Sequence, residues 1–196
     1  MRIQYLIFTI LFIFAFSSIS AQTPEFGLRG GLILSSTGGA DAGDSRIKPG
    51  FMAGVYVPLA ITNMYTLEPG VYYSLKGSRI EDGIQSSTFH LHYLDVPVYA
   101  RIFLTEGFNI FAGPQISYLI GSRSRFENNG QIFIDTSTEG LRKFDLGLGI
   151  GIGYNLPVPV NLNINLGYDW GLLSLDSEGN TNTYNRLLRL AVGYTF

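Results

Sequence analysis

The stretch "FDLGLGIGIGYNLPVPVNLNINLGYDW", residues 144–170, alternates large apolar side chains with small or polar ones. Apolar or aromatic residues occupy the even positions from Phe144 to Tyr154, and glycine occupies the odd positions from 147 to 153. A period of two is typical of a β-strand whose two faces meet different surroundings. The stretch therefore predicts two antiparallel strands joined by a short connection, each with one apolar face.

The same period recurs along the chain and predicts eight strands. We expect them at 25–34, 50–60, 64–76, 90–102, 108–120, 144–154, 160–172 and 185–196. Long polar connections follow every other strand, at 35–49, 77–89, 121–143 and 173–184. Short connections alternate with them, at 61–63, 103–107 and 155–159. This layout predicts an all-β fold, an eight-stranded antiparallel up-and-down transmembrane β-barrel with its long loops at one end.

The N-terminus predicts export. Arg2 is followed by the apolar run 6–16 and by a mostly small and polar segment that ends at Ala21. We interpret 1–21 as a cleavable signal peptide and 22–196 as the outer-membrane β-barrel domain. The alternative, a retained membrane helix, is disfavoured because the run is shorter than the roughly 20 residues that span a bilayer.

Composition excludes several classes of protein. The formal net charge is −2, so no charged surface indicates nucleic acid as a partner. Cysteine is absent, which excludes disulfides, a cysteine-ligated zinc and a thiol nucleophile.

Aromatic residues on the apolar parity lie near the predicted strand ends, in two rows. Phe108 and Tyr118 are 10 positions apart, as are Phe144 and Tyr154. In tilted strands this spacing separates the rows by about 25 Å, the height of a lipid-facing band between aromatic girdles. The predicted girdle comprises Phe26, Phe51, Tyr65, Tyr73, Phe108, Tyr118, Phe144, Tyr154, Trp170, Tyr184 and Tyr194.

The opposite parity carries four positive and four negative residues, which we expect in the lumen. A buried charge needs a partner, so the eight predict a lumenal charge network. Its members are Arg29, Glu68, Lys76, Asp95, Arg101, Asp145, Asp169 and Arg189. A soluble lipocalin-like barrel would alternate too, but its calyx would not carry these charges.

The glycine stripe 147–153 also faces this predicted interior. Small residues opposite large ones fill a narrow lumen, and we expect the stripe to accommodate Met52, Tyr56, Tyr72, Tyr99 and Arg101. A phosphate-binding glycine loop is excluded because Ile152 stands where the third glycine would be required and no helix follows.

Prolines and one change of parity predict irregular pairing. Pro69, Pro97 and Pro114 fall within predicted strands, where each removes a ladder donor, so we expect local bulges or lumenal water there. We also expect a bulge near Tyr93 and Leu94, where the apolar parity changes.

Five segments resemble a known family. These are "LEPGVYYSLKG" (67–77), "YLDVPVYAR" (93–101), "FAGPQISYL" (111–119), "FDLGLGIGIGY" (144–154) and "LRLAVGYTF" (188–196). Together they resemble the outer-membrane-protein β-barrel domain of the porin family, which includes PorT-like proteins and is similar to OmpA and OmpX in having eight strands. The resemblance covers the mature chain and implies an outer-membrane barrel. It implies no reaction, and it identifies Phe196 as the signal for the barrel-assembly machinery.

Two candidate chemistries involve the only histidines. His90 and His92 share one strand face and could hold a metal with Glu81 and Asp82, but no third ligand has diagnostic spacing. The same pair with Ser86, Ser87 or Thr88 would suit a lipid-acting enzyme or a protease, provided that the groups meet in space. We expect no metal, no cofactor and no catalytic residue.

Function then depends on the lumen and the loops. An eight-stranded barrel is only wide enough for side chains, so balanced charges favour a filled lumen over a small-solute channel, which remains the alternative. Loops 35–49, 121–143 and 173–184 could contact an envelope or secretion-complex protein, and "QIFIDTS" (131–137) could extend a hairpin beyond the membrane. The sequence predicts a non-enzymatic barrel in contact with outer-membrane lipid.

Overall fold

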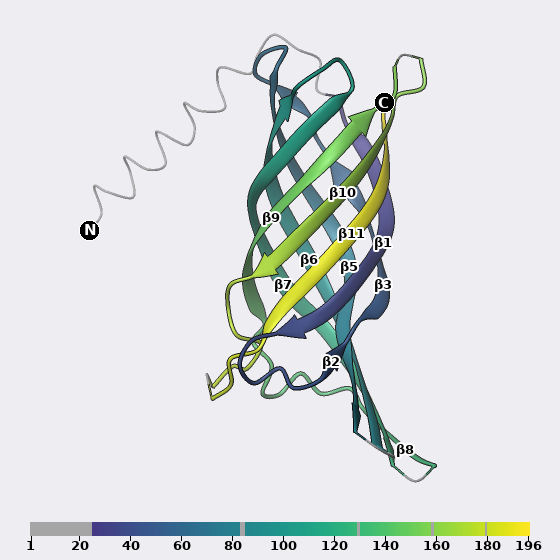
Figure 1. The fold of residues 1–196 in the computed structure, drawn as a ribbon, viewed down its shortest axis with the longest axis vertical. Helices are drawn as coiled ribbons and strands as arrows, with labels where there is room; N and C mark the ends of the chain where they lie inside the picture. Colours follow the sequence, from purple (N-terminus) through teal and green to yellow (C-terminus); the bar gives the residue numbers. More distant parts are fainter. Residues whose placement is uncertain (1–24, 83–84, 129, 158, 179) are drawn as a thin grey trace, which may run out of the picture.

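The computed structural model describes residues 25–82, 85–128, 130–157, 159–178 and 180–196. In this part of the chain, eight antiparallel strands form a closed ring, which confirms the predicted fold class (Figure 1). The strands of the ring are β1 (Gly27–Gly38), β3 (Lys48–Tyr56), β5 (Tyr65–Asp82), β6 (Gln85–Phe103), β7 (Phe108–Asn128), β9 (Phe144–Asn155), β10 (Leu162–Gly171) and β11 (Tyr184–Thr195). The predicted signal peptide, 1–21, lies outside the described residues.

The ring closes where the first strand meets the last. β1 pairs with β11 from Gly27↔Thr195 to Gly38↔Tyr184, so no edge is left along the wall of the barrel. Closure satisfies the backbone hydrogen-bonding groups that lipid cannot satisfy. No helix in the described part of the chain is long and apolar enough to cross a membrane.

Alternation decides which side chains are inside. In β9 the even positions are exposed, including Leu148 and Ile152, while Asp145, Gly149 and Gly153 are buried. The other strands of the wall show the same period, so the outer surface is apolar and the interior is polar. A surface of this kind is suited to lipid rather than to water.

Three strands extend far beyond their predicted ends, and β1 runs four residues past its own, to Gly38, within the predicted loop 35–49. β5, β6 and β7 run past the wall and, with β8 (Gln131–Asp135), form a four-stranded protruding sheet that stands clear of the barrel (Figure 1). The short strand β2 (Ser45–Arg46) pairs with β5 at the base of this sheet, and β4 (Leu59–Ala60) pairs with β5 near the opposite end of the barrel. Predicting loops at 77–89 and across all of 121–143 was therefore wrong, whereas the hairpin extension at 131–137 is confirmed for β8.

The predicted bulge is displaced. Along β6, Leu91 and Tyr93 are buried on the same face as Asp95, so this strand keeps its parity. The register changes in the partner strand, because His92 pairs with Gly121 while Tyr93 pairs with Leu119, which leaves Ile120 as the extra residue of β7. Leu91 and Tyr93 are apolar because they form an internal cluster with Leu119, not because the strand turns over.

The expectation of bulges at the prolines is also wrong. The β5–β6 register is the same before and after the gap that follows Pro69↔Val98, and the β6–β7 register is unchanged on both sides of the gap that follows Pro97↔Gln115. The three prolines lie on adjacent strands near Val98, so the lost donors fall in one patch of the wall. The ladder is interrupted there for two residues without a change of register.

Candidate functional site: the filled lumen

All eight charged residues of the predicted network lie in the barrel interior, and each is at most 7% exposed. They come from six strands of the wall, β1, β5, β6, β9, β10 and β11. Ser117 of a seventh strand, β7, joins them by a hydrogen bond. The structure brings seven of the eight into ion pairs, in three separate groups.

The first group is centred on Glu68 in the half of the barrel that has the short connections. The carboxylate accepts two hydrogen bonds from Arg29, at 2.6 and 3.1 Å, and one from Arg101 at 2.9 Å. Arg29 also donates to Asn163 at 3.0 Å, and its guanidinium lies 3.9 Å from the centroid of the Tyr56 ring. The amide oxygens of Asn163, Asn109 and Asn165 accept further N–H groups of the two guanidinium groups. The Nε atom of each arginine is buried without a hydrogen-bond partner among the described residues.

The second group crosses the middle of the barrel. Arg189 donates to Asp169 at 3.2 Å and to the hydroxyl of Tyr99 at 2.8 Å. The Tyr99 hydroxyl in turn donates to Gln115 at 3.3 Å, and its ring packs on Phe111 with centroids 5.2 Å apart. This group spans the lumen from β10 and β11 to β6 and β7, so it acts as a crossbar.

The third group lies toward the long loops. Lys76 donates to Asp95 at 2.8 Å and to Ser117 at 3.3 Å, with its ammonium 4.6 Å from the centroid of the Tyr93 ring. Beyond it, Leu91, Tyr93 and Leu119 form a buried apolar cluster against which Leu141 packs. The cluster closes this end of the lumen beneath the loops.

Asp145 is the exception to the predicted pairing. Its Oδ2 atom accepts a hydrogen bond from the Asn185 amide at 2.8 Å, and no ion pair reaches it among the described residues. Oδ1 is buried with no hydrogen-bond partner in the same part of the chain. Asp145 is therefore satisfied in part by a neutral amide rather than by a cation.

The glycine stripe of β9 fits the large side chains of neighbouring strands. A Cβ at Gly149 would lie 2.5 Å from Asp169 and 2.9 Å from Tyr99, and one at Gly153 would lie 2.7 Å from Arg101. Gly151 would meet Leu166 and Phe111. The expected contacts with Tyr99 and Arg101 are confirmed.

The stripe does not accommodate the other residues expected there. Tyr56 lies against Gly27, and Tyr72 lies against Gly54 and Gly70. Met52 packs instead in the cluster of Ile33, Tyr56, Tyr72, Leu187 and Ala191. Side chains of β3 and β5 therefore fill the side of the lumen nearest their own strands.

The middle of the lumen has almost no free space. The void between Arg29, Tyr72, Tyr99, Phe111 and Arg189 measures about 10 Å³. That is near the lower limit of the space that one water molecule needs. The described side chains leave room for about one water molecule at this level.

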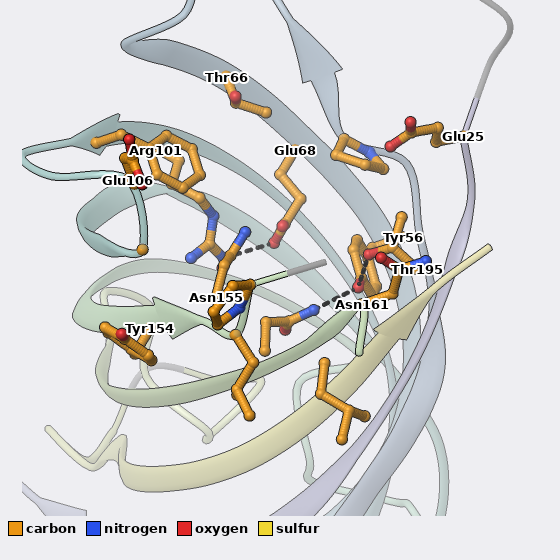
Figure 2. Close-up of a pocket in the computed structure, with 17 residues that line it drawn as sticks. Glu25, Tyr56, Thr66, Glu68, Arg101, Glu106, Tyr154, Asn155, Asn161 and Thr195 are labelled. Carbon is orange, nitrogen blue, oxygen red and sulfur yellow. Dashed lines mark hydrogen bonds and ion pairs between the residues drawn. The ribbon is translucent and has the colours of Figure 1, made fainter. Parts of the chain in front are cut away.

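A larger cavity, the vestibule, opens at the end with the short connections (Figure 2). It measures about 540 Å³, and Tyr56, Thr66, Tyr154, Asn155 and Thr195 are among its lining residues. Figure 2 shows Arg101 and Glu68 meeting at its floor. The vestibule therefore ends on the first ion-pair group.

The predicted aromatic girdle lies on the outer surface. Eight of its residues are exposed, and Tyr73, Phe108 and Tyr184 are half-buried. Register partners lie in the same row. Tyr118 is opposite Phe144 in the row at one end, and Phe108 is opposite Tyr154 in the row at the other end. The terminal Phe196 stacks on Phe26 with ring centroids 4.8 Å apart.

Among the side chains that the structure describes, the histidines form no site with other ligating groups. His92 Nδ1 lies 2.5 Å from the hydroxyl of Tyr73. Within the described ranges, no group of three or more His, Cys, Asp or Glu residues could hold a metal ion. Side chains of Glu81 and Asp82 are outside the description, and no hydrogen bond joins either histidine to Ser86, Ser87 or Thr88 among the bonds of the described residues.

Sequence reasoning missed the neutral part of the network. Asn109, Asn163, Asn165 and Asn185 are buried and bond to the charged groups or to one another. Gln115 is also buried and bonds to Tyr99 and Ser117. The signal was present, because each occupies the lumenal parity of its strand. Lys48 is likewise buried and was not predicted.

Comparison with known proteins agrees with this geometry. A family model described as "Outer membrane protein beta-barrel domain" matches residues 20–177, so the chain is a member of this family of outer-membrane barrels. No curated protein sequence matches the chain.

Solved structures share the fold at low sequence identity. Neisserial surface protein A is 15% identical with a TM-score of 0.57, over 87% of this chain and 97% of that one. Ail, the attachment invasion locus protein of Yersinia pestis, is 18% identical with a TM-score of 0.53, over 89% and 100%. A major outer membrane protein from Thermus thermophilus is 16% identical with a TM-score of 0.52, over 89% and 100%. The protein is an outer-membrane β-barrel protein, located in the outer membrane.

Proposed function

We propose that the protein is a non-enzymatic, non-conducting anchor that presents its protruding sheet and loops at the cell surface for contact with other molecules. The observation that carries the proposal is the filled middle of the lumen. Side chains that enclose a void of only about 10 Å³ lie there between the vestibule and the loop end. A hydrated ion needs a continuous polar path, and the crossbar of Asp169, Arg189 and Tyr99 occupies it.

The positions of the long connections and of Phe196 in the barrel support the remaining parts of the proposal. The long connections lie at the end that is extracellular in barrels of this kind, so the protruding sheet faces outward from the cell. Phe196, stacked at the opposite rim, serves as the assembly signal, and 1–21 is removed on export. The motif resemblance to PorT-like proteins supports a contact with an envelope or secretion-complex protein.

Thiol accessibility tests the closed lumen. The chain has no cysteine, so single substitutions report one position each. Thr66→Cys lines the vestibule, whereas Ser117→Cys lies beyond the crossbar beneath the apolar cluster. In detergent-folded protein, a charged thiol reagent should modify Thr66→Cys within minutes and leave Ser117→Cys unmodified until the protein is denatured. Equal rates at both positions would contradict a closed lumen.

A further inference from the structure

The last strand of the protruding sheet, β8, has a free edge. In the part of the chain that the structure describes, β8 pairs with one strand only, β7. All five residues are exposed, and Phe133 is exposed to 62%. Figure 1 shows the hairpin of β7 and β8 at the far tip, away from the barrel and the other loops.

The sequence of this strand contains neither lysine nor proline. Native proteins block free edges with lysine, proline or a bulge. The segment 131–135 reads QIFID, with three consecutive residues of high β-propensity and one terminal acid. β8 pairs with β7 without a change of register. Such an edge is a template for another strand.

The register determines which backbone groups face outward. Asn128 and Gln131 are register partners separated by two residues, the second of which, Gly130, has a φ of 80°. A two-residue hairpin loop places its flanking residues in a hydrogen-bonded pair, and such pairs alternate along antiparallel strands. The odd residues of β8 therefore bond to β7. Ile132 and Ile134 turn their N–H and C=O groups to the free edge.

This edge is complementary to itself. We propose that β8 pairs antiparallel with β8 of a second copy of this chain, with Phe133 opposite Phe133 of that copy. In this register each Ile132 faces an Ile134, so the outward groups of both residues meet partners in four hydrogen bonds. Each Gln131 faces an Asp135, so an amide can donate to each carboxylate.

Both faces of the joined sheet gain matched side chains. Phe126 lies opposite Phe133 across β7 and β8, so pairing creates a row of four phenylalanines on one face. The other face gains four isoleucines. Phe89 already packs edge-on against Phe126, with centroids 5.9 Å apart, and extends the phenylalanine row. Apolar surface that is now exposed is thereby covered.

The symmetry places the two barrels in facing membranes. Antiparallel edge strands are related by a two-fold axis perpendicular to their sheet. The protruding sheet continues the barrel wall, so that axis lies near the membrane plane, and the two barrels point in opposite directions. The pairing bridges two outer membranes. A five-residue strand pair is weak alone, but many copies per surface act together.

This inference depends on the proposed function, which makes the protruding sheet a contact surface, and it names the partner. Cysteine scanning tests the register directly in proteoliposomes of mature protein with phosphatidylcholine. Phe133→Cys puts two thiols opposite each other, at a Cα separation suited to a disulfide. Gln131→Cys is the matched control, because its two thiols would lie about 13 Å apart along the strands.

Mild oxidation should convert most Phe133→Cys protein to dimer and at least tenfold less of the Gln131→Cys protein. Absence of dimer at Phe133, a maximum at another position of 131–135, or equal dimer at all five would overturn the proposal.

A second measurement follows vesicle clustering by light scattering. Ile134→Pro removes one outward N–H and leaves the bonds to β7, whereas Ile134→Val keeps the N–H. We expect clustering with the unchanged chain and with Ile134→Val, and at least a fivefold loss with Ile134→Pro. Vesicles that stay dispersed with the unchanged chain, or clustering unaffected by proline, would refute the pairing. The closed lumen, tested by thiol accessibility, would stand in that case.

Discussion

The same three strands, β5, β6 and β7, form part of the barrel wall and then the protruding sheet, and the two regions differ in what covers their inner faces. In the wall, inward residues such as Glu68 and Tyr99 meet inward side chains of other strands and are buried. In the protruding sheet no opposite wall exists, so Phe126 and Phe133 remain exposed on the same face. Burial therefore requires closure of the ring as well as the inward parity.

The largest effect should follow the loss of Glu68. Glu68→Gln leaves Arg29 and Arg101 buried without their shared anion, and breaking a buried ion pair costs about 3–5 kcal/mol. We expect the free energy of unfolding to fall by about 3 kcal/mol or more. Urea titration measures it, with the folded fraction read from the gel shift, the difference in migration between unheated folded barrel and boiled protein.

A matched substitution at the rim distinguishes the loss of the buried ion pairs from the loss of one negative charge alone. Glu106 lines the mouth of the vestibule and is exposed, so Glu106→Gln should change the unfolding free energy by less than about 0.5 kcal/mol. Equal losses in the two variants would mean that the interior group does not stabilise the barrel.

A smaller effect is expected from the glycine stripe. Gly151→Ala places a methyl group against Leu166 and Phe111, and overpacking a filled interior costs about 1–3 kcal/mol. Gly30→Ala is the control, because its Cβ would lie 3.7 Å from the nearest atom, the Met52 carbonyl oxygen. If thermal unfolding midpoints of the two variants coincide, the stripe is not a packing requirement.

Loss of an aromatic contact in the protruding sheet should leave the barrel intact. Phe89→Ala removes the edge-on contact with Phe126, worth about 0.5–1.5 kcal/mol locally. We expect faster proteolysis within 121–136 and an unchanged barrel gel shift. Loss of the gel shift would show that the two regions unfold together.

The smallest effect is a local titration in the loop after β10. Backbone N–H groups of Glu178, Asn180 and Thr181 donate to the exposed Asp176 carboxylate and lower its pKa below the ordinary value of 3.8. A depressed pKa stabilises the folded loop above the unfolded pKa, and this contribution is lost as pH falls through the folded pKa. The amide NMR shifts of those three residues should titrate with a midpoint below 3.8, and Asp176→Asn should abolish the change. A midpoint at or above 3.8 would contradict the bonded loop.

The wall could be predicted from the sequence because parity alone assigns a residue to lipid or lumen. Arg29 and Asp169 were placed inside by that rule, although it could not show that Asp145 would bond to Asn185 rather than to a cation. The length of the protruding sheet was missed because both of its faces meet water, so 77–89 shows little apolar alternation. The bulge was assigned to β6 because Leu91 and Tyr93 are apolar, whereas it lies in β7 at Ile120.

Single-channel recording from the refolded mature protein, 22–196, in a planar bilayer tests the central claim that the lumen is filled. With a heat-shifting, folded barrel in the membrane, we predict no discrete openings, either from the unchanged chain or from Arg101→Gln, which leaves the crossbar of Asp169, Arg189 and Tyr99 in place. Stable unitary openings in the unchanged chain, altered in size by Arg101→Gln or Glu68→Gln, would contradict the filled lumen and identify a small-solute channel.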